Sequence, residues 1–277
     1  MSKAGLPAGF AFSQAALQDY ADCPRRFQLR YVQRIRWPAA QSKSIQTMER
    51  LSREGAAFHR LVHQHTVGIS EEALDRIAKE DGVQDLWKTY LRDYPRNLPQ
   101  TVRRSEVRLA VPIGDYALTA RYDLLAIEPQ QRAVIVDWKT GRYRPSRSSL
   151  ERRYQTQVYP FVLVEAGTLL NGGEAIAPVQ VEFLYWFGKK EPRVEQFPYG
   201  EEQHRAAGET LERVIAEILA IDLSEWPLAP DAKQCTYCRY QTLCARQPAE
   251  GAEEPFEFER EVDSFDLDLE QIAEIEF

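Results

Sequence analysis

Two acidic residues and a lysine fall on neighbouring segments that the sequence predicts to be β-strands. Asp137 and Lys139 are two residues apart, and Asp123 lies on the preceding segment, across a short turn. Because side chains alternate along a strand, Asp137 and Lys139 share one face and Trp138 takes the other. Carboxylates hold hard divalent cations, and a cation beside a lysine can activate water and offset developing charge. The set therefore has the composition that metal-assisted phosphodiester cleavage needs.

D-W-K alone is a short pattern that is common by chance, and the residues around it support a functional interpretation. Asp137 follows the apolar run V-I-V and precedes T-G, which places a carboxylate at the end of a buried strand. Upstream, G-A-A-F-H ends at His59 on a predicted helix and supplies a fourth candidate ligand. Downstream, Gln155 and Tyr159 are four residues apart and share one helix face.

The four cysteines form a second candidate centre. Cys23 stands alone near the start of the chain, whereas Cys235, Cys238 and Cys244 follow the pattern C-x2-C-x5-C. Four thiolates can hold zinc or an iron–sulfur cluster, and a redox dithiol or unrelated buried cysteines are the alternatives. So few cysteines in 277 residues, with no signal-like apolar run, favour a reducing cytoplasmic setting over a disulfide framework.

Alternating and helical periodicities predict the elements that would position these residues. Strands between flanking helices indicate an α/β core sheet with a helical N-terminal cap. The predicted helices are 14–22, a helix starting at Pro24, 49–66, 71–80, 84–94, 149–166 and 200–221, and the predicted strands are 101–112, 115–128, 132–139, 178–187 and 192–198.

Charge is unevenly distributed along the chain. The net charge is −7, but residues 250–277 hold 12 acids and one base, which leaves 34 bases and 30 acids in residues 1–249. Arg25, Arg26 and Arg30 recur among apolar residues and could contact phosphates. The acidic segment alternates with phenylalanine and aliphatic residues, which suits partner docking, a shield over a basic groove or a solvated terminus. No apolar stretch has the length of a membrane span.

Taken in order, G-A-A-F-H, R-Y-D, V-D-W-K-T-G and Q-T-Q-V-Y resemble the motifs of the PD-(D/E)XK nuclease superfamily in its RecB-like branch. C-P-R-R-F at Cys23 and the C-x2-C-x5-C pattern resemble the iron–sulfur subset, which includes CRISPR-associated exonucleases and the AddB nuclease domain. The resemblance covers about residues 10–246. It implies a restriction-endonuclease-like central mixed sheet flanked by helices, with a helical N-terminal cap and a C-terminal cysteine knuckle.

The resemblance also assigns roles within the predicted active site. It implies that His59, Asp123 and Asp137 bind Mg²⁺ or Mn²⁺, with the backbone carbonyl of Trp138 as a further ligand. Lys139 is then the catalytic lysine.

Further residues follow from the same resemblance. Gln155 and Tyr159 match the helix that supports the active site and contacts DNA, and the four cysteines match the ligands of a 4Fe-4S cluster. Glu106 lies on the upstream strand where relatives often carry an acid, and Ala120 stands near where relatives usually have glycine. His63, His65 and His204 are interpreted as packing or surface residues, although His59 and His63 could in principle share a zinc ion.

The sequence thus predicts a helical region over 1–100, a nuclease core and cysteine cluster over 101–246 forming one composite domain with it, and an acidic partner-binding tail over 247–277. The expected function is a cytoplasmic, metal-dependent DNA exonuclease acting on single strands or ends. It would work with a helicase or another subunit in CRISPR adaptation, DNA repair by recombination, or antiviral defence. The alternative is a DNA-binding adaptor subunit that retains the fold without catalysis.

Overall fold

The computed structural model describes most of the chain up to residue 246. The described residues are 5–7, 9–35, 43–141, 143–189, 193–222, 224, 226–236 and 238–246. The predicted acidic tail, 247–277, lies outside them. None of the described helices is long and apolar enough to cross a membrane.

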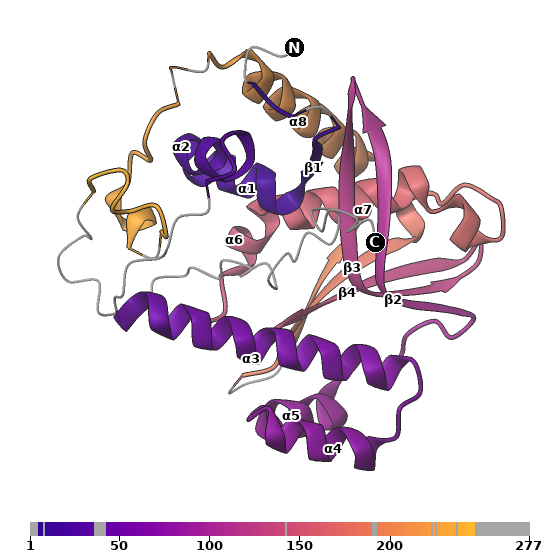
Figure 1. The fold of residues 1–277 in the computed structure, drawn as a ribbon. Helices are drawn as coiled ribbons and strands as arrows, with labels where there is room; N and C mark the ends of the chain where they lie inside the picture. The colour runs from indigo at the N-terminus through magenta and orange to yellow at the C-terminus, as the bar shows by residue number, and fades with distance from the viewer. Residues whose placement is uncertain are drawn as a thin grey trace, which may run out of the picture.

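A six-stranded mixed sheet forms the centre of the protein (Figure 1). Its order is β1-β3-β4-β5-β6, and β2 pairs with β3. The pairs β1·β3 and β4·β5 are parallel and the others are antiparallel. The strands are β1 (Ala11–Ser13), β2 (Val102–Ile113), β3 (Tyr116–Glu128), β4 (Arg132–Lys139), β5 (Val181–Phe187) and β6 (Arg193–Pro198).

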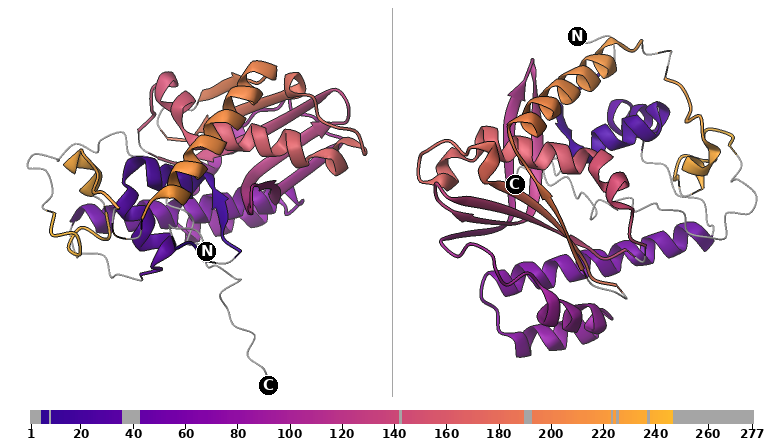
Figure 2. Two further views of the ribbon diagram at one scale, coloured as in Figure 1. Left: turned by 90° about the horizontal axis from the view of Figure 1, so that it is seen from above. Right: turned by 180° about the vertical axis from the view of Figure 1, so that it is seen from behind.

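Helices cover both faces of this sheet (Figures 1 and 2). The α-helices are α1 (Gln14–Asp22), α2 (Pro24–Phe27), α3 (Lys43–Thr66), α4 (Glu71–Glu80), α5 (Gln84–Asp93), α6 (Arg147–Arg152), α7 (Tyr154–Ala166) and α8 (Glu201–Ala220). A π-helix, η1 (Gln28–Val32), continues α2, and 3₁₀ turns occupy η2 (Thr168–Asn171), η3 (Pro178–Gln180) and η4 (Ala232–Cys235). The expected α/β class, with a mixed sheet between helices, is confirmed.

Two apolar cores lie on opposite sides of the sheet. The first joins the sheet to α1, α7 and α8, and the second joins it to α3, α4 and α5. Strand β4 contributes to both, because Ile135 packs in the first core while Val134 and Val136 pack in the second. Both faces of β4 are therefore buried, which explains why V-I-V is a continuous apolar run rather than an alternating one.

Local sequence signals fixed several boundaries. Ser13 caps α1 as predicted, since its side chain accepts a hydrogen bond from the backbone N–H of Ala16. The predicted helix 149–166 is instead two helices, broken at Arg153, whose ψ of 140° is extended. The Thr156 hydroxyl donates to the Leu150 carbonyl at 2.6 Å, and the N–H of Arg153 donates to the same carbonyl at 3.1 Å, so the end of α6 is tied to the start of α7.

Candidate active site and cysteine pocket

The end of β4 carries a buried ion pair. Lys139 Nζ lies 2.9 Å from Asp137 Oδ2, and the two side chains are only 6% and 5% exposed. Trp138 points to the other face and packs in the second core, as strand alternation predicts. The sheet thus holds a carboxylate and an ammonium together on one face of β4.

Gln155 connects the two charged groups. It lies on α7 and is 2% exposed. Its amide nitrogen donates to Asp137 Oδ1 at 2.5 Å, and its amide oxygen accepts from Lys139 Nζ at 2.9 Å. One neutral side chain therefore fixes the positions of both ions.

Tyr159, one turn further along α7, has a different environment. Its ring packs against Tyr122 and Phe183 in the first core, and its backbone carbonyl accepts the Tyr122 hydroxyl at 2.9 Å. Tyr159 therefore belongs to the first core.

A second group of ligand atoms adjoins this pair. We call His59, Glu106 and Asp123 the metal group, because one ligand atom from each lies within 4.8 Å of the others. His59 comes from α3, Glu106 from β2 and Asp123 from β3, so three elements that are distant in sequence converge there. The combination of imidazole nitrogen and carboxylate oxygens is suitable for a divalent cation.

The backbone of Trp138 ties the metal group to the ion pair. Its N–H donates to Asp123 Oδ2 at 2.8 Å, and its carbonyl oxygen lies 2.9 Å from His59 Nε2. The other ring nitrogen, His59 Nδ1, lies 3.2 Å from Asp123 Oδ1. The structure therefore brings His59, Asp123 and the Trp138 carbonyl together. Asp137 and Lys139 precede and follow Trp138 in the chain.

The charges of this group are mutually stabilising. Burial disfavours the imidazolium form of His59, but the Asp123 carboxylate outweighs it, and the pKa of His59 rises from 6.5 to about 9. Burial would raise the pKa of Asp123, yet His59 and the N–H of Trp138 lower it. At neutral pH the two side chains consequently form an ion pair.

Glu106 and Asp123 reach the site through a break in the β2·β3 ladder. Pairing runs continuously except between Ser105↔Leu124 and Val107↔Tyr122, where Glu106 and Asp123 face each other unpaired. Glu106 has a φ of 57°, an unusual value for a residue with a side chain. Such irregularities bend a strand and redirect side chains, and they are frequent next to active sites. Glu106, a secondary candidate from sequence, thus lies next to the other candidate ligands, His59 and Asp123.

Tyr185 was missed by sequence reasoning. It pairs with Asp137 in the parallel β4·β5 register, and its ring centroid lies 5.3 Å from Lys139 Nζ. At that distance the aromatic face can stabilise the ammonium. The register between β4 and β5 brings Tyr185 next to Asp137. Tertiary packing sets this register, and no local pattern in the sequence predicts it.

The other histidines are held by ordinary contacts. His63 Nδ1 lies 2.7 Å from Ser105 Oγ, His65 Nδ1 lies 3.1 Å from the Tyr90 hydroxyl, and His204 bonds to Tyr199 and Glu165.

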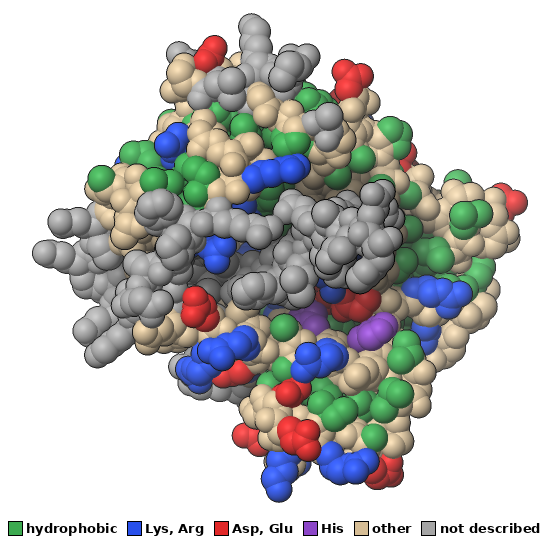
Figure 3. Space-filling view, viewed as in Figure 1, with side chains coloured by type: hydrophobic (Ala, Val, Ile, Leu, Met, Phe, Trp, Pro, Cys, Tyr) green, Lys and Arg blue, Asp and Glu red, His purple; other side chains and the backbone are tan. Residues whose placement is uncertain are grey.

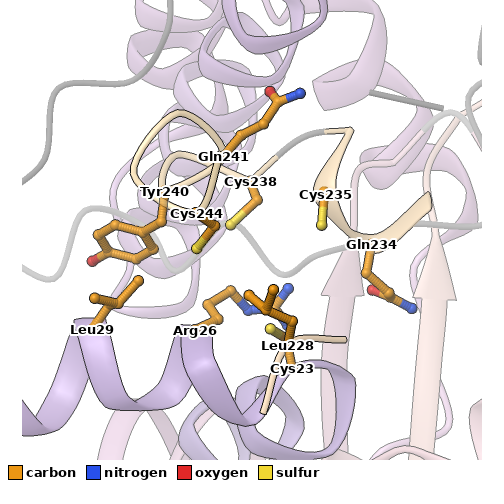
Figure 4. Close-up of a pocket in the computed structure, with 10 residues that line it drawn as sticks. All are labelled: Cys23, Arg26, Leu29, Leu228, Gln234, Cys235, Cys238, Tyr240, Gln241 and Cys244. Atoms are coloured by element: carbon orange, nitrogen blue, oxygen red, sulfur yellow. The ribbon is translucent and has the colours of Figure 1, made fainter. Parts of the chain in front are cut away.

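The four cysteines line one pocket, which we call the cysteine pocket (Figure 4). Cys23, Cys235 and Cys238 are buried, Cys244 is partly exposed, and all four are free thiols. Turns bring the last three together, with the N–H of Cys238 donating to the Cys235 carbonyl at 3.0 Å. Burial raises the pKa of the Cys244 thiol, and a charge on Cys238 raises it further. The structure thus gathers Cys23 and the distant C-x2-C-x5-C segment around one space.

The arginines that follow Cys23 differ in exposure. Arg26 is 5% exposed and pairs with Asp19 at 2.6 Å and Asp22 at 2.7 Å, while it also lines the cysteine pocket. Arg30 is 37% exposed and pairs with Asp19 at 3.0 Å, and Arg25 bonds to Gln28. This placement favours a role for Arg26 in joining α1 and α2 to the pocket.

Comparison with known proteins adds a family and two structural likenesses. The family model described as the PD-(D/E)XK nuclease superfamily matches residues 11–245. A candidate exonuclease from Eubacterium rectale has 12% identity and a TM-score of 0.46, covering 76% of this chain and 80% of its own. A protein designated SSO0001 has 12% identity and a TM-score of 0.43, covering 87% and 88%. No curated protein sequence matches the chain.

Proposed function

The chain belongs to the PD-(D/E)XK nuclease superfamily, and on that basis we propose that it is a deoxyribonuclease dependent on Mg²⁺ or Mn²⁺. Its substrate is proposed to be single-stranded DNA or DNA ends, which it degrades as an exonuclease. One observation carries the proposal: a metal-ligand group and a buried Asp137–Lys139 pair are joined through Trp138.

The residues fit a divalent cation. His59, Glu106 and Asp123 offer a nitrogen and carboxylate oxygens within bonding reach of one another, and the Trp138 carbonyl lies beside His59. Asp137 is the neighbouring acid, already oriented by Gln155. When bound, the cation supplies Lewis-acid activation of a phosphate and of water.

Lys139 completes the chemistry. Its ammonium is fixed by Asp137 and Gln155, so it can orient an attacking water and offset the charge that develops on the phosphate. Because the group is buried and held in advance, it needs no rearrangement to act.

Cleavage of end-labelled single strands tests the assignment. The wild type is expected to degrade linear DNA with Mg²⁺ or Mn²⁺, and Lys139→Ala is expected to abolish cleavage. Lys88→Ala, which removes an exposed lysine from α5, is the matched control. Unchanged cleavage by Lys139→Ala would refute the assignment, and an inactive wild type that still binds DNA would support the adaptor alternative.

We further propose that the cysteine pocket holds a structural 4Fe-4S cluster. The pocket gathers Cys23 from the start of the chain and the three thiols of the C-x2-C-x5-C segment around one space. Four thiolates are the ligand set that holds such a cluster.

Anaerobic purification tests the cluster. The protein is expected to be brown, with visible absorbance that bleaches on reduction and disappears in Cys244→Ser. A colourless protein containing one equivalent of zinc would refute it.

The substrate and partner proposals extend beyond the site. Arg25, Arg30, Gln155 and Tyr159 are proposed to contact or support bound DNA. The chain lacks the G-x4-G-K-[ST] motif, so any unwinding would come from a helicase or another defence or recombination subunit, docked on residues 247–277. Truncation after residue 249 should abolish such a complex, and a complex that survives truncation would exclude the tail as its docking segment.

A further inference from the structure

Two arginines face each other on the β2–β3 hairpin. Arg108 and Arg121 are direct partners in the antiparallel register, and both are exposed. We call them the arginine rung. Partners at such a position have side chains about 5 Å apart. The rung therefore places two basic side chains next to each other on an exposed part of the hairpin.

The arginine rung adjoins the metal group. Arg108 is two residues beyond Glu106, and Arg121 is two residues before Asp123, which corresponds to about 7 Å along the strands. Arg121 also reaches back toward the site, since its Nε and Nη2 contact Glu106 Oε2 at 2.8 and 2.5 Å. One cation of the rung is therefore anchored to a predicted metal ligand.

The rung lies on the face turned away from the first core. The next rung, Val107 and Tyr122, packs into that core, so Arg108 and Arg121 project from the opposite face. His59 approaches the metal group from α3, whose residues pack in the second core. In the space-filling view, histidine, acidic and basic side chains adjoin on the surface near α3 (Figure 3).

We propose that the arginine rung binds the phosphate backbone of the DNA strand next to the phosphate that is cleaved. This rests on the proposed function, because it takes DNA as the substrate and the metal group as the cleavage site. Guanidinium groups match phosphate oxygens in geometry and charge, and backbone contacts position a strand without reading its sequence.

Binding measured without metal tests the rung independently of cleavage. The probe is fluorescein-labelled oligothymidylate, titrated in EDTA over a series of salt concentrations. Arg108→Gln is expected to weaken binding by up to about fivefold. It should also reduce the slope of log affinity against log salt by about 0.7, the value for one lost phosphate contact on a single strand.

Arg104→Gln is the matched control. Arg104 is exposed on the same strand, but it pairs with Leu125 of the first core and so projects from the other face. The substitution removes the same charge, and we expect the affinity for DNA and the slope of log affinity against log salt to stay at wild-type values.

Kinetics distinguish the two members of the rung. Arg108→Gln should raise KM with little change in kcat, whereas Arg121→Gln should also lower kcat because it releases Glu106. If wild type cleaves DNA but Arg108→Gln and Arg104→Gln bind alike, the rung proposal is wrong and the nuclease proposal stands. A lower thermal midpoint for Arg108→Gln than for Arg104→Gln would mark Arg108 as structural. If Arg108→Gln loses binding to a peptide of residues 250–277 but binds DNA like the wild type, the rung binds the acidic tail and not DNA.

Discussion

Removing the Lys139 ammonium should affect folding as well as catalysis, because its partner is buried with it. At 2.9 Å and an effective dielectric constant of about 20, the Asp137–Lys139 attraction is about 6 kcal/mol. Desolvation of both ions offsets much of this, but deleting one partner leaves the other buried and uncompensated. We therefore expect Lys139→Met to lower the free energy of unfolding by about 3–5 kcal/mol.

The double variant Asp137→Asn/Lys139→Met separates pairing from packing. It removes both charges, keeps the side-chain volumes similar and leaves an amide that can still bond to Gln155. Most of the lost stability should return, while nuclease activity should stay at least about 10²-fold below wild type in each variant. Urea unfolding in EDTA measures the stabilities without interference from a bound cation.

Two results would refute this reasoning. A Lys139→Met protein within about 0.5 kcal/mol of wild type would mean that the pair is not desolvated. Strictly additive losses in the double variant would mean that the two residues do not interact.

Three further predictions follow from the same site. The pKa of His59 is raised in the folded protein, so its ion pair with Asp123 stabilises the fold fully below pH 6.5, and this contribution is lost as pH rises toward about 9. Urea unfolding in EDTA should show this loss of stability with pH, and the His59→Gln variant should no longer show it. Gln155→Ala should lower kcat about 10- to 100-fold, because Asp137 and Lys139 both lose their hydrogen bond to Gln155. The circular dichroism spectrum should stay that of the wild type. An unchanged kcat would contradict a positioning role for Gln155. Gly55→Val should weaken Mn²⁺ binding measured by calorimetry. A Cβ at Gly55 would already lie 3.1 Å from Thr140 Oγ1, and a larger side chain would displace α3, the helix that carries His59. A variant that binds Mn²⁺ with wild-type affinity would show that α3 can adjust.

Much of the sheet could be predicted because its signals are local. The strand 132–139 has the predicted bounds, and its alternation at Asp137, Trp138 and Lys139 matches the structure. Its apolar run and its polar end are both visible within eight residues of sequence.

The rest depended on contacts between distant segments. Strand β1 has three residues and forms only because it pairs with Ala117, Leu118 and Thr119 of β3. Likewise, the displacement of Glu106 arises opposite Asp123 and breaks a pattern that alternation would continue. The sequence marks Arg26 as a candidate for phosphate contact, and it does not show that Arg26 is buried and paired with two aspartates of the preceding helix. Each outcome is decided by a partner that periodicity does not identify.

The positions of the four cysteines in the sequence decide when the cysteine pocket can form during synthesis. Cys235 follows Cys23 by 212 residues, and strands β2 to β6 are encoded between them. At translation rates of about 5–20 residues per second, Cys23 emerges some 10–40 s before its three companions. The pocket can therefore close only after the residues of the active site have been made, so a chain that stops early can contain every catalytic residue and still lack three of its four thiols.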